Sequence, residues 1–315
     1  MKQIIKQLAP IWLVSILIRL SALFKCKWPL GLAQKSLANS ANSKNLSGKI
    51  LTKMAYDRNP MLTMFADKYL AREYVEKKVG SQYLNKLLAA GDSIQLLRTT
   101  PLPNNFALKS NHGSGGMILV WDKAPPENKL PKHSKNVWSQ FLVQPGNFEL
   151  GKAERLAKNW LSNSYYFRPG QFPEWAYKNI KPVVLVEELM LDEQGELPSD
   201  YKFFMANGEC LFIQVDTSRF DGHKRDLYTK SWEIIPGAYH FPQSGSTLPK
   251  PKYLEEMISV AASLAAGVDF VRVDLYETNK GVKFGELTNY PGGGIEKFAP
   301  ESLDNELGSK WVQNY

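Results

Sequence analysis

The chain has 315 residues, of which 43% are hydrophobic and 22% are charged. This composition is typical of a folded globular protein and excludes a disordered or fibrous one. A chain of this length has room for two or more lobes around a cleft. The net charge of +8 indicates either a merely basic surface or attraction to anions such as nucleotides, acidic glycans or lipid headgroups. Because the charge comes with no zinc-ligand spacing and no RNA-binding signature, we expect no nucleic-acid partner.

Residues 1–30 are predicted to form an apolar helix whose location is open. Residues 8–24 are apolar apart from serines and Arg19, and they fall just short of the ~20 residues that a transmembrane helix needs. A signal peptide, a helix on a membrane surface and a helix docked on the protein's own core all fit this pattern. The chain has only Cys26 and Cys210, so no disulfide framework can form, which favours a reducing compartment.

The remaining chain is predicted to contain a linker, a helix and then many short strands. Residues 31–48 are rich in Ser, Asn and Lys, which is typical of a linker or surface loop. Asn59-Pro60 predicts the start of a helix that ends near Gly80, and apolar spacing predicts a second helix over Tyr253–Ala266. Asn207-Gly208 predicts a type I′ hairpin turn. The mixture predicts an α+β fold with antiparallel hairpins, not a doubly wound parallel sheet. The predicted strands are Phe106–Lys109, Met117–Trp121, Val183–Met190, Tyr201–Ala206, Glu209–Asp216, Phe270–Leu275 and Val282–Leu287.

A glycine-rich flap follows the first predicted strand. That strand ends in Lys109, the next residues contain Gly113, Gly115 and Gly116, and a second strand returns. Bare backbone N–H groups in such a turn can approach a phosphate, and the lysine adds a positive charge. The segment differs from a Walker loop because a strand follows it. Taken alone, it is also explained by an ordinary glycine-rich hairpin turn.

Two further groups of charges lie on predicted elements. Lys68 and Arg72 are four residues apart on the first helix, where they share either a phosphate or a solvated face. Glu187 and Glu188 follow a run of buried β-favouring residues without a turn. Glutamates at that position suit a hinge that meets the adenine and ribose of a nucleotide, or simply a strand end that reaches solvent.

The hairpin over residues 270–287 carries the strongest signal of chemistry. If Asn279–Gly281 is a three-residue turn and Thr278 pairs with Val282, Asp274 lies opposite Glu286. Opposed residues have Cβ atoms roughly 5 Å apart, so two like charges there are destabilising. A bound Mg²⁺ or Mn²⁺ relieves that repulsion, because both ions prefer oxygen ligands. Arg272 falls on the same face. The alternatives are two surface carboxylates near lysines, or a bulge that shifts the register by one residue.

The order of these residues resembles the nucleotide site of the ATP-grasp superfamily, and several phrases resemble its TupA-like branch, named for teichuronopeptide biosynthesis. The resemblance runs from about Lys49 to Lys310. It implies an ATP-grasp fold of two α+β lobes enclosing a nucleotide, with residues 49–310 as the catalytic domain. The phrases are Tyr56–Pro60, Ala66–Tyr69, Leu108–Gly116, Tyr177–Ile180, Asp200–Phe204, Val271–Asp274 and Phe284–Thr288.

The resemblance also implies a role for each site residue. Lys68 and Lys109 would hold ATP phosphates, Glu187 and Glu188 would form the hinge, and Asp274 and Glu286 would bind Mg²⁺ or Mn²⁺. Many ATP-grasp enzymes have an Asn two residues after the metal-binding glutamate, whereas here Thr288 has that position and Asn289 follows it. Either residue is a candidate to complete the metal site. The flap that would close over the phosphates contains His112, Gly113, Ser114, Gly115 and Gly116. The candidate catalytic residues are Arg272, Lys202, Arg225 and His223.

The activity implied is that of an ATP-dependent carboxylate–amine ligase acting through an acyl phosphate. The expected partners are ATP, an anionic sugar or glycan carboxylate such as a uronic acid of a cell-surface polysaccharide, and an amine such as an amino acid. A sugar phosphotransferase and a non-catalytic glycan-binding protein are the alternatives. Because ATP is scarce outside the cytoplasm, we expect a cytoplasmic protein, with contact between residues 1–30 and the inner membrane face left open.

Overall fold

The computed structural model describes residues 44–313 apart from 167, 169–171 and 218–221, together with Gln34 and Ala38. The helix expected over residues 1–30 lies outside the described residues. Gln34 belongs to the predicted linker and is buried, and its Nε2 donates a hydrogen bond to the carbonyl of Pro173. None of the described helices is long and apolar enough to cross a membrane.

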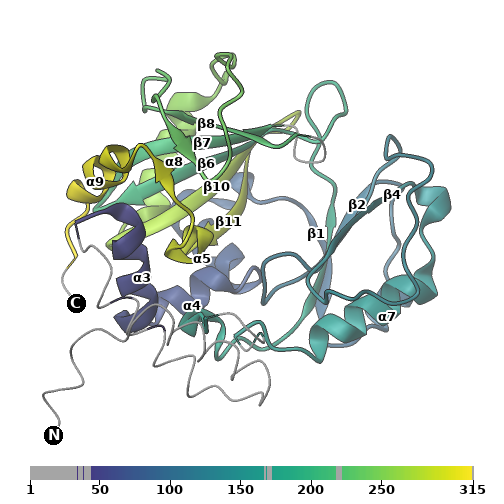
Figure 1. Ribbon diagram of the computed structural model, residues 1–315. Coiled ribbons are helices and arrows are strands. Elements are labelled where there is room, and N and C mark those ends of the chain that lie inside the picture. Colours follow the sequence, from purple (N-terminus) through teal and green to yellow (C-terminus); the bar gives the residue numbers. More distant parts are fainter. Residues whose placement is uncertain are drawn as a thin grey trace, which may run out of the picture.

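Two five-stranded sheets form two lobes that lie side by side (Figure 1). The first sheet has the order β1-β5-β2-β3-β4, and the second has the order β11-β10-β6-β7-β8. All of their strand pairs are antiparallel except β3 with β4, which are parallel. This architecture confirms the predicted α+β class. The strands are β1 (Leu87–Gly91), β2 (Phe106–Ser110), β3 (Met117–Val120), β4 (Gln140–Val143), β5 (Val184–Glu188), β6 (Asp200–Ala206), β7 (Glu209–Thr217), β8 (Lys224–Tyr228), β10 (Phe270–Thr278) and β11 (Gly281–Thr288), with β9 (Ala238–Tyr239) and β12 (Phe298–Ala299) paired separately.

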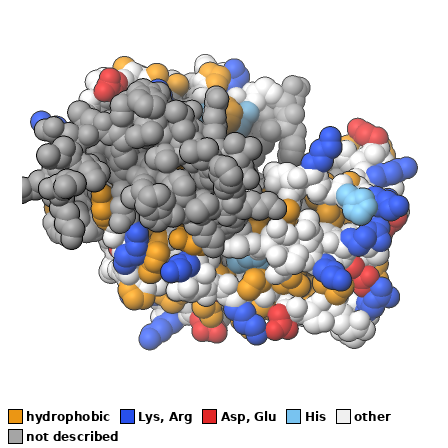
Figure 2. All heavy atoms as spheres, turned by 60° about the horizontal axis from the view of Figure 1, so that its bottom comes forward, with side chains coloured by type: hydrophobic (Ala, Val, Ile, Leu, Met, Phe, Trp, Pro, Cys, Tyr) orange, Lys and Arg blue, Asp and Glu red, His pale blue; other side chains and the backbone are white. Residues whose placement is uncertain are grey.

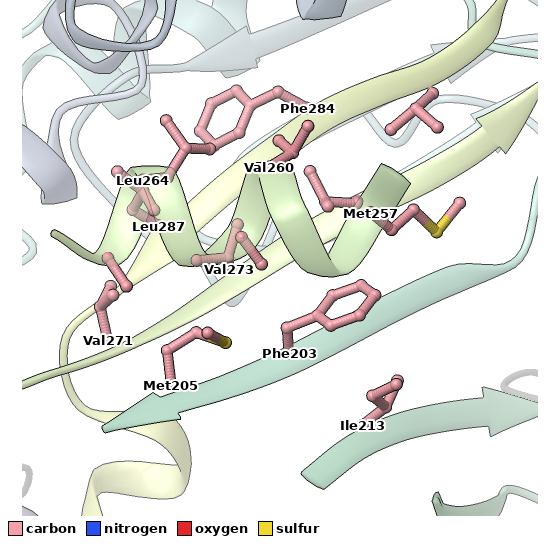
Figure 3. Packing of buried hydrophobic residues seen from close by; sticks show 14 of the residues in the cluster. Phe203, Met205, Ile213, Met257, Val260, Leu264, Val271, Val273, Phe284 and Leu287 are labelled. Carbon is pink, nitrogen blue, oxygen red and sulfur yellow. The ribbon is translucent and has the colours of Figure 1, made fainter. Parts of the chain in front are cut away.

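Each sheet has one face covered by an amphipathic helix. The helix α7 (Leu150–Leu161) places Leu156, Ala157 and Trp160 in a core with β2, β3 and β5. On the second sheet, Met257 and Leu264 of α8 (Leu254–Ala265) lie among the side chains of β6, β10 and β11 (Figure 3). Burial of these apolar side chains is the main stabilising contribution to both lobes. The other helices are α3 (Leu46–Tyr56), α4 (Met61–Ala66), α5 (Leu70–Val79), α6 (Leu96–Thr99) and α9 (Glu301–Ser309).

The helix predicted from Asn59 to Gly80 is two helices, α4 and α5, so this prediction is wrong at its middle. Its start is confirmed to within one residue, because the Asn59 side chain accepts the N–H of Met61. The break occurs at Asp67, whose Oδ1 accepts the N–H groups of Tyr69 at 2.9 Å and Leu70 at 3.3 Å. A carboxylate that binds free N–H groups starts a new helix at α5.

Two hairpins of the second sheet have turns of two residues, although the sequence predicted different lengths for them. Asn207 and Gly208 both have positive φ, and Ala206 pairs with Glu209, so the predicted turn is confirmed. The predicted three-residue turn at Asn279–Gly281 is wrong, because Thr278 pairs with Gly281 across a two-residue turn. The Thr278 hydroxyl favours this tighter turn by accepting the N–H of Lys280 and donating to the carbonyl of Gly281.

Candidate functional site

The predicted pair of carboxylates is present in the β10–β11 hairpin. Asp274 is paired with Glu286, and Arg272 is paired with Thr288, as the sequence predicted. The tighter turn shifts the register by one residue near the loop, and an irregularity between Asp274 and Leu275 restores it. Asp274 is almost fully buried, whereas the Glu286 side chain is 32% exposed. The pair therefore has one side that solvent or a ligand can reach.

Three cations neutralise this pair of carboxylates. Arg272 Nη2 donates to Asp274 Oδ2 at 2.7 Å and to Glu286 Oε1 at 2.9 Å, so the guanidinium bridges the two acids. Lys202 Nζ lies 2.7 Å from Asp274 Oδ2 and also contacts Asp200. Lys68 Nζ lies 3.9 Å from Glu286 Oε2. The repulsion that the sequence assigned to a metal is thus relieved by arginine and lysine in this structure.

The pKa values of the pair follow from these contacts. Burial raises the pKa of Asp274, and Arg272 and Lys202 offset only part of that effect. Burial acts in the same direction on Glu286, but Lys68 and Arg272 outweigh it and lower the pKa of that carboxyl. Burial alone would lower the pKa of Arg272, yet the two carboxylates raise it overall. Arg272 is therefore a permanent positive charge between the two acids.

Lys68 connects the corner between α4 and α5 to the flap. Its backbone N–H donates to the carbonyl of Asn111 at 3.0 Å, and its Nζ donates to the carbonyl of Gly113. Burial lowers the pKa of Lys68, with the Glu286 carboxylate acting in the opposite direction and the nearby Lys109 adding to the decrease. A single lysine thus contacts the flap of the first lobe and a carboxylate of the second.

The glycines of the flap pack against Trp138. A Cβ on Gly115 would lie 1.9 Å from the Trp138 carbonyl oxygen, and one on Gly113 would lie 2.6 Å from the Trp138 ring. Gly115 and Gly116 also have positive φ, which favours glycine. Ser114 at the tip is exposed. No side chain larger than hydrogen fits the two flap positions against Trp138 without movement.

His112 holds the beginning of the flap. Its Nδ1 lies 3.0 Å from Asn111 Oδ1, and its Nε2 lies 3.1 Å from the carbonyl oxygens of Trp160 and Asn163. Burial lowers its pKa. Both ring nitrogens contact the protein here, so in this structure the side chain anchors the flap to the end of α7.

The strand β5 places Glu187 beneath Lys109. Glu187 is paired with Ala107, so it is the diagonal neighbour of Lys109 on one face of the sheet, and the Lys109 Nζ to Glu187 Oε2 distance is 2.7 Å. Arg72 Nη1 donates to Glu187 Oε1 at 2.8 Å. The prediction that Lys68 and Arg72 share one helix face is wrong, because Lys68 lies in the break before α5 and each residue meets a different glutamate.

Glu188 lies at the predicted hinge. It forms ion pairs with Lys86 at 3.0 Å and with Lys280 at 2.8 Å, and hydrogen bonds from Lys280 and Lys86 lower its pKa. The Lys280 contact joins the exit of β5 to the turn of the β10–β11 hairpin. A cavity of about 350 Å³ opens there, between the residues after β5 and this turn.

The structure brings Thr288, and not Asn289, to the carboxylates. Thr288 Oγ1 donates to Glu286 Oε1 at 3.0 Å. Asn289 is buried, and its Nδ2 donates to the Leu62 carbonyl of α4 at 2.8 Å, so its amide is held on the α4 side. Residues 286 and 288 share a face of β11, whereas Asn289 follows the end of the strand, and its buried Oδ1 has no hydrogen-bond partner among the described residues.

The donors around the pair fit a hard divalent cation. Asp274 and Glu286 offer carboxylate oxygens, and Thr288 adds a hydroxyl oxygen. Across the described part of the chain, no three His, Cys, Asp or Glu side chains converge on one point. Two carboxylates still suffice for Mg²⁺, which is commonly held by one or two carboxylates together with substrate phosphates and water.

Arg225 and His223 gather at Asp216 of β7, which lies on the same face of the second sheet as Lys202. Arg225 Nε donates to Asp216 Oδ1 at 2.6 Å, and its Nη1 donates to Glu296 Oε2 at 3.0 Å and to the Tyr239 carbonyl at 3.3 Å. His223 stacks on Phe241 and its Nε2 lies 3.3 Å from Asp216 Oδ1. Arg225 is buried and bound to protein groups, so here it ties β8 to its neighbours. Arg219, next to this cluster in sequence, lies outside the described residues.

Sequence reasoning missed a second cluster that is electrostatically close to the carboxylates. Arg168 lies 3.7 Å from the centre of the Tyr165 ring and forms an ion pair with Glu174. Burial raises the pKa of Glu174 to about 7, partly offset by Arg168. The negative charge of Glu286 also reaches Tyr165 and Tyr177. These residues lie in an irregular connection between α7 and β5, where no periodic pattern exists to reveal them.

The two lobes and the charged residues between them define the ATP-grasp fold. The model of the family described as TupA-like ATPgrasp matches residues 48–312. The chain therefore belongs to the TupA-like ATP-grasp family.

Comparison with other known proteins adds only distant likenesses. No curated protein matches the chain. A structure of the ATP-grasp ligase PsnB with a minimal precursor is 10% identical, covers 78% of this chain and 59% of its own, and has a TM-score of 0.38. D-alanine–D-alanine ligase from Helicobacter pylori is 14% identical, with coverage of 79% and 62% and a TM-score of 0.39. N5-carboxyaminoimidazole synthetase from Staphylococcus aureus is 10% identical, with coverage of 79% and 53% and a TM-score of 0.38. At these TM-scores the likenesses carry no argument of their own.

Proposed function

We propose that this protein is an ATP-dependent ligase that joins a carboxylate to an amine, with residues 49–310 as its catalytic domain. One observation carries the proposal. Asp274, Glu286 and Arg272 of the second lobe meet Lys68, which also contacts the flap of the first lobe. Buried carboxylates and cations cost desolvation energy that uncharged side chains in the same positions would not cost. Opposed carboxylates beside several cations are therefore better explained by a metal-bound polyphosphate than by the stability of the fold.

The nucleotide would lie between the lobes. Lys68 and Lys109 would hold its phosphates, and the flap from His112 to Gly116 would close over them. Glu187 and Glu188 would form the hinge, beside the cavity that the β10–β11 turn also lines. The ion pairs of Lys109 with Glu187 and of Lys68 with Glu286 would exchange carboxylate for phosphate when the nucleotide enters.

Asp274 and Glu286 would hold Mg²⁺ or Mn²⁺, with Thr288 beside Glu286 in place of Asn289. The ion supplies charge neutralisation and orientation of the phosphates when it is bound. Lys202 keeps Asp274 and Asp200 in place through its two ion pairs. Because Arg272 contacts both carboxylates, it is positioned beside the phosphoryl group that they would orient.

The reaction would proceed in two transfers. An oxygen of the substrate carboxylate attacks the γ-phosphorus of ATP, the bond to the β–γ bridging oxygen breaks, and ADP leaves. The amine then attacks the acyl carbon, phosphate leaves with the bonding electrons, and the amine loses a proton to form the amide. Arg272 and the lysines would stabilise the charge that develops on the phosphoryl and acyl oxygens. His223 and Arg225 are proposed to act on the side of the carboxylate substrate.

The carboxylate substrate is proposed to be an anionic sugar or glycan, such as a uronic acid of a cell-surface polysaccharide, and the amine an amino acid. The net charge of +8 supports an anionic partner, and Figure 2 shows Lys and Arg side chains spread over the described part of one face. Cytoplasmic ATP supports action inside the cell, with residues 1–30 proposed to contact the inner membrane face.

Phosphate release from ATP tests the proposal when amino acids are screened against uronic acids in the presence of Mg²⁺. The expected result is release that needs both partners, with a product lighter than their sum by one water. Asp274→Asn is expected to abolish release. Phosphate transferred to the sugar without any need for an amine would replace the ligase by a phosphotransferase. A lack of any Mg·ATP-dependent rise in melting temperature would refute nucleotide binding altogether.

A further inference from the structure

The β10–β11 hairpin contains one residue more on β11 than the regular ladder needs. From the turn to the middle of the hairpin the pairs are regular, ending with Leu275 opposite Phe284. The next pair is Asp274 with Glu286, so Gly285 is the extra residue of a β-bulge. The bulge separates a regular outer part of the hairpin from the part that carries the charges.

If residue 285 were paired regularly instead of bulged, the two carboxylates would not meet. Continuing the outer register would place Gly285 opposite Asp274 and Glu286 opposite Val273. Val273 is fully buried in the core under α8, as Figure 3 shows. A one-residue slip turns every following side chain to the other face of the sheet. Glu286 would then be an unpaired carboxylate in an apolar core, at a large desolvation cost.

The bulge has room for glycine only. A Cβ on residue 285 would lie 2.5 Å from Cε2 of Tyr276 and 3.1 Å from the carbonyl oxygen of Asp274. The backbone of Tyr276 is held by its pairing with Asp200 of β6, in unbroken register with Asp274 opposite Lys202. Glycine is therefore favoured at position 285 by lack of space, because an aromatic ring from the strand that carries Asp274 lies against it.

We propose that Gly285 is a positioning residue for the metal-binding pair. Its bulge, closed by the ring of Tyr276, turns Glu286 to the face of Asp274, Lys202 and Arg272. Larger residues at position 285 separate the two carboxylates without removing either of them. This inference rests on the proposed function, since it assigns the bulge a purpose only if Asp274 and Glu286 bind a metal with the nucleotide.

Mn²⁺ binding to the full-length protein with ADP, followed by electron paramagnetic resonance, tests the inference. Gly285→Ala is expected to weaken Mn²⁺ binding at least about tenfold, while ADP binding without metal changes less than about threefold. Gly146→Ala is the matched control, because a Cβ there meets nothing within 4 Å. The double variant Tyr276→Leu with Gly285→Ala removes the blocking ring atom and is expected to recover part of the Mn²⁺ affinity.

The outcomes separate this inference from the proposed function. Wild-type Mn²⁺ affinity in Gly285→Ala would overturn the role of Gly285. No Mn²⁺ binding by the wild-type protein with ADP would refute the proposed function itself. If Gly285→Ala does not fold, deletion of Gly285 replaces it. The deletion leaves a regular hairpin in which the Glu286 side chain still faces Asp274, so affinity within about threefold of wild type is expected. A loss of more than about tenfold would overturn the register argument.

Discussion

The two faces of the second sheet are built from the same strands but differ in character where Lys202 and Asp274 lie. On the face under α8, Phe203 of β6 and Val273 of β10 are fully buried among apolar side chains. On the other face, the neighbouring residues Lys202 and Asp274 are also buried but form an ion pair. At these positions, alternation along each strand separates a side chain that packs under α8 from a neighbour that carries a charge. Further along the charged side, Phe204, Phe212 and Phe270 belong to a second apolar cluster.

Comparison of these neighbouring residues shows when the burial of a side chain indicates function. A buried apolar side chain is explained by stability alone, whereas a buried charge needs partners that offset its desolvation. Asp274, Lys202 and Arg272 satisfy one another, yet uncharged residues of similar shape would satisfy the fold at lower cost. Their presence on one face is best explained by a charged ligand.

The largest expected effect comes from the charged face. Asp274→Asn removes one of two candidate metal ligands and is expected to lower ligase turnover about a thousandfold or more, equivalent to about 4 kcal/mol in the barrier. Steady-state phosphate release measures the change. Circular dichroism should show an unchanged fold, and the rise in melting temperature with Mg·ATP should disappear. A variant that retains more than about a tenth of wild-type turnover would contradict the assignment.

The apolar face is expected to respond in stability. Phe203→Ala leaves a cavity under α8 and should lower the free energy of unfolding by about 3–5 kcal/mol. Urea denaturation measures this loss. The folded fraction should still show the Mg·ATP-dependent rise in melting temperature, which separates this variant from Asp274→Asn. Loss of that rise in folded protein would mean that the two faces are not independent.

Glu174 is expected to make stability depend on pH. Its pKa is raised to about 7 by burial, so the folded protein binds this proton more tightly than the unfolded chain does. The contribution of this proton to the free energy of unfolding is fully present below the unfolded pKa of about 4.5 and is lost as the pH rises through about 7. It amounts to about 3 kcal/mol. Arg168 is the cation facing Glu174, with Tyr165 and Tyr177 nearby.

The direction of this pH dependence is tested by measuring the free energy of unfolding of wild type and Glu174→Gln between pH 4.5 and 8. The wild type should lose stability relative to the variant as the pH rises. Equal slopes for both proteins would show that Glu174 titrates in the folded protein as it does in the unfolded chain.

The smallest effect is expected at the β6–β7 turn, which lies at the other end of β6 from Lys202. Gly208 has φ +85° and open space around its Cα, so Gly208→Ala strains only the backbone. We expect a loss of about 1 kcal/mol in unfolding free energy and no change in turnover. Thermal unfolding and phosphate release measure the two. A fall in turnover would show that the hairpin geometry reaches the site.

The sequence was sufficient to predict which charged residues share a face of the hairpin, but not the turn and the bulge that place them there. The predicted pairing of Asp274 with Glu286 is correct, but it was reached through a three-residue turn that the structure lacks, and the bulge at Gly285 compensates for that error. The bulge also left a signal, because the core residues Val282, Phe284 and Leu287 are spaced two and then three apart, whereas a regular strand keeps a spacing of two. That change of spacing marks the position of the extra residue.

Other features had no local signal. The break at Asp67 depends on Asn111, which is distant in sequence and donates its Nδ2 to the Asp67 carboxylate at 2.8 Å. The packing of the flap depends on Trp138, which lies in an irregular loop. The strand β1 was missed because its sequence, Leu-Leu-Ala-Ala-Gly, contains none of the β-branched or aromatic residues that favour strands. Contacts between distant segments decide these features.

The ion pairs of the cleft have a consequence for the order in which ligands arrive. Lys109 is paired with Glu187, and Lys68 faces Glu286, so these two lysines would offer an incoming polyanion little unbalanced positive charge. On the proposed function, free ATP would have to displace carboxylates that then repel it, whereas ATP that arrives with its own divalent ion would bring a countercharge for those same carboxylates. Such a site would select the metal complex over the bare nucleotide through competition and not through shape.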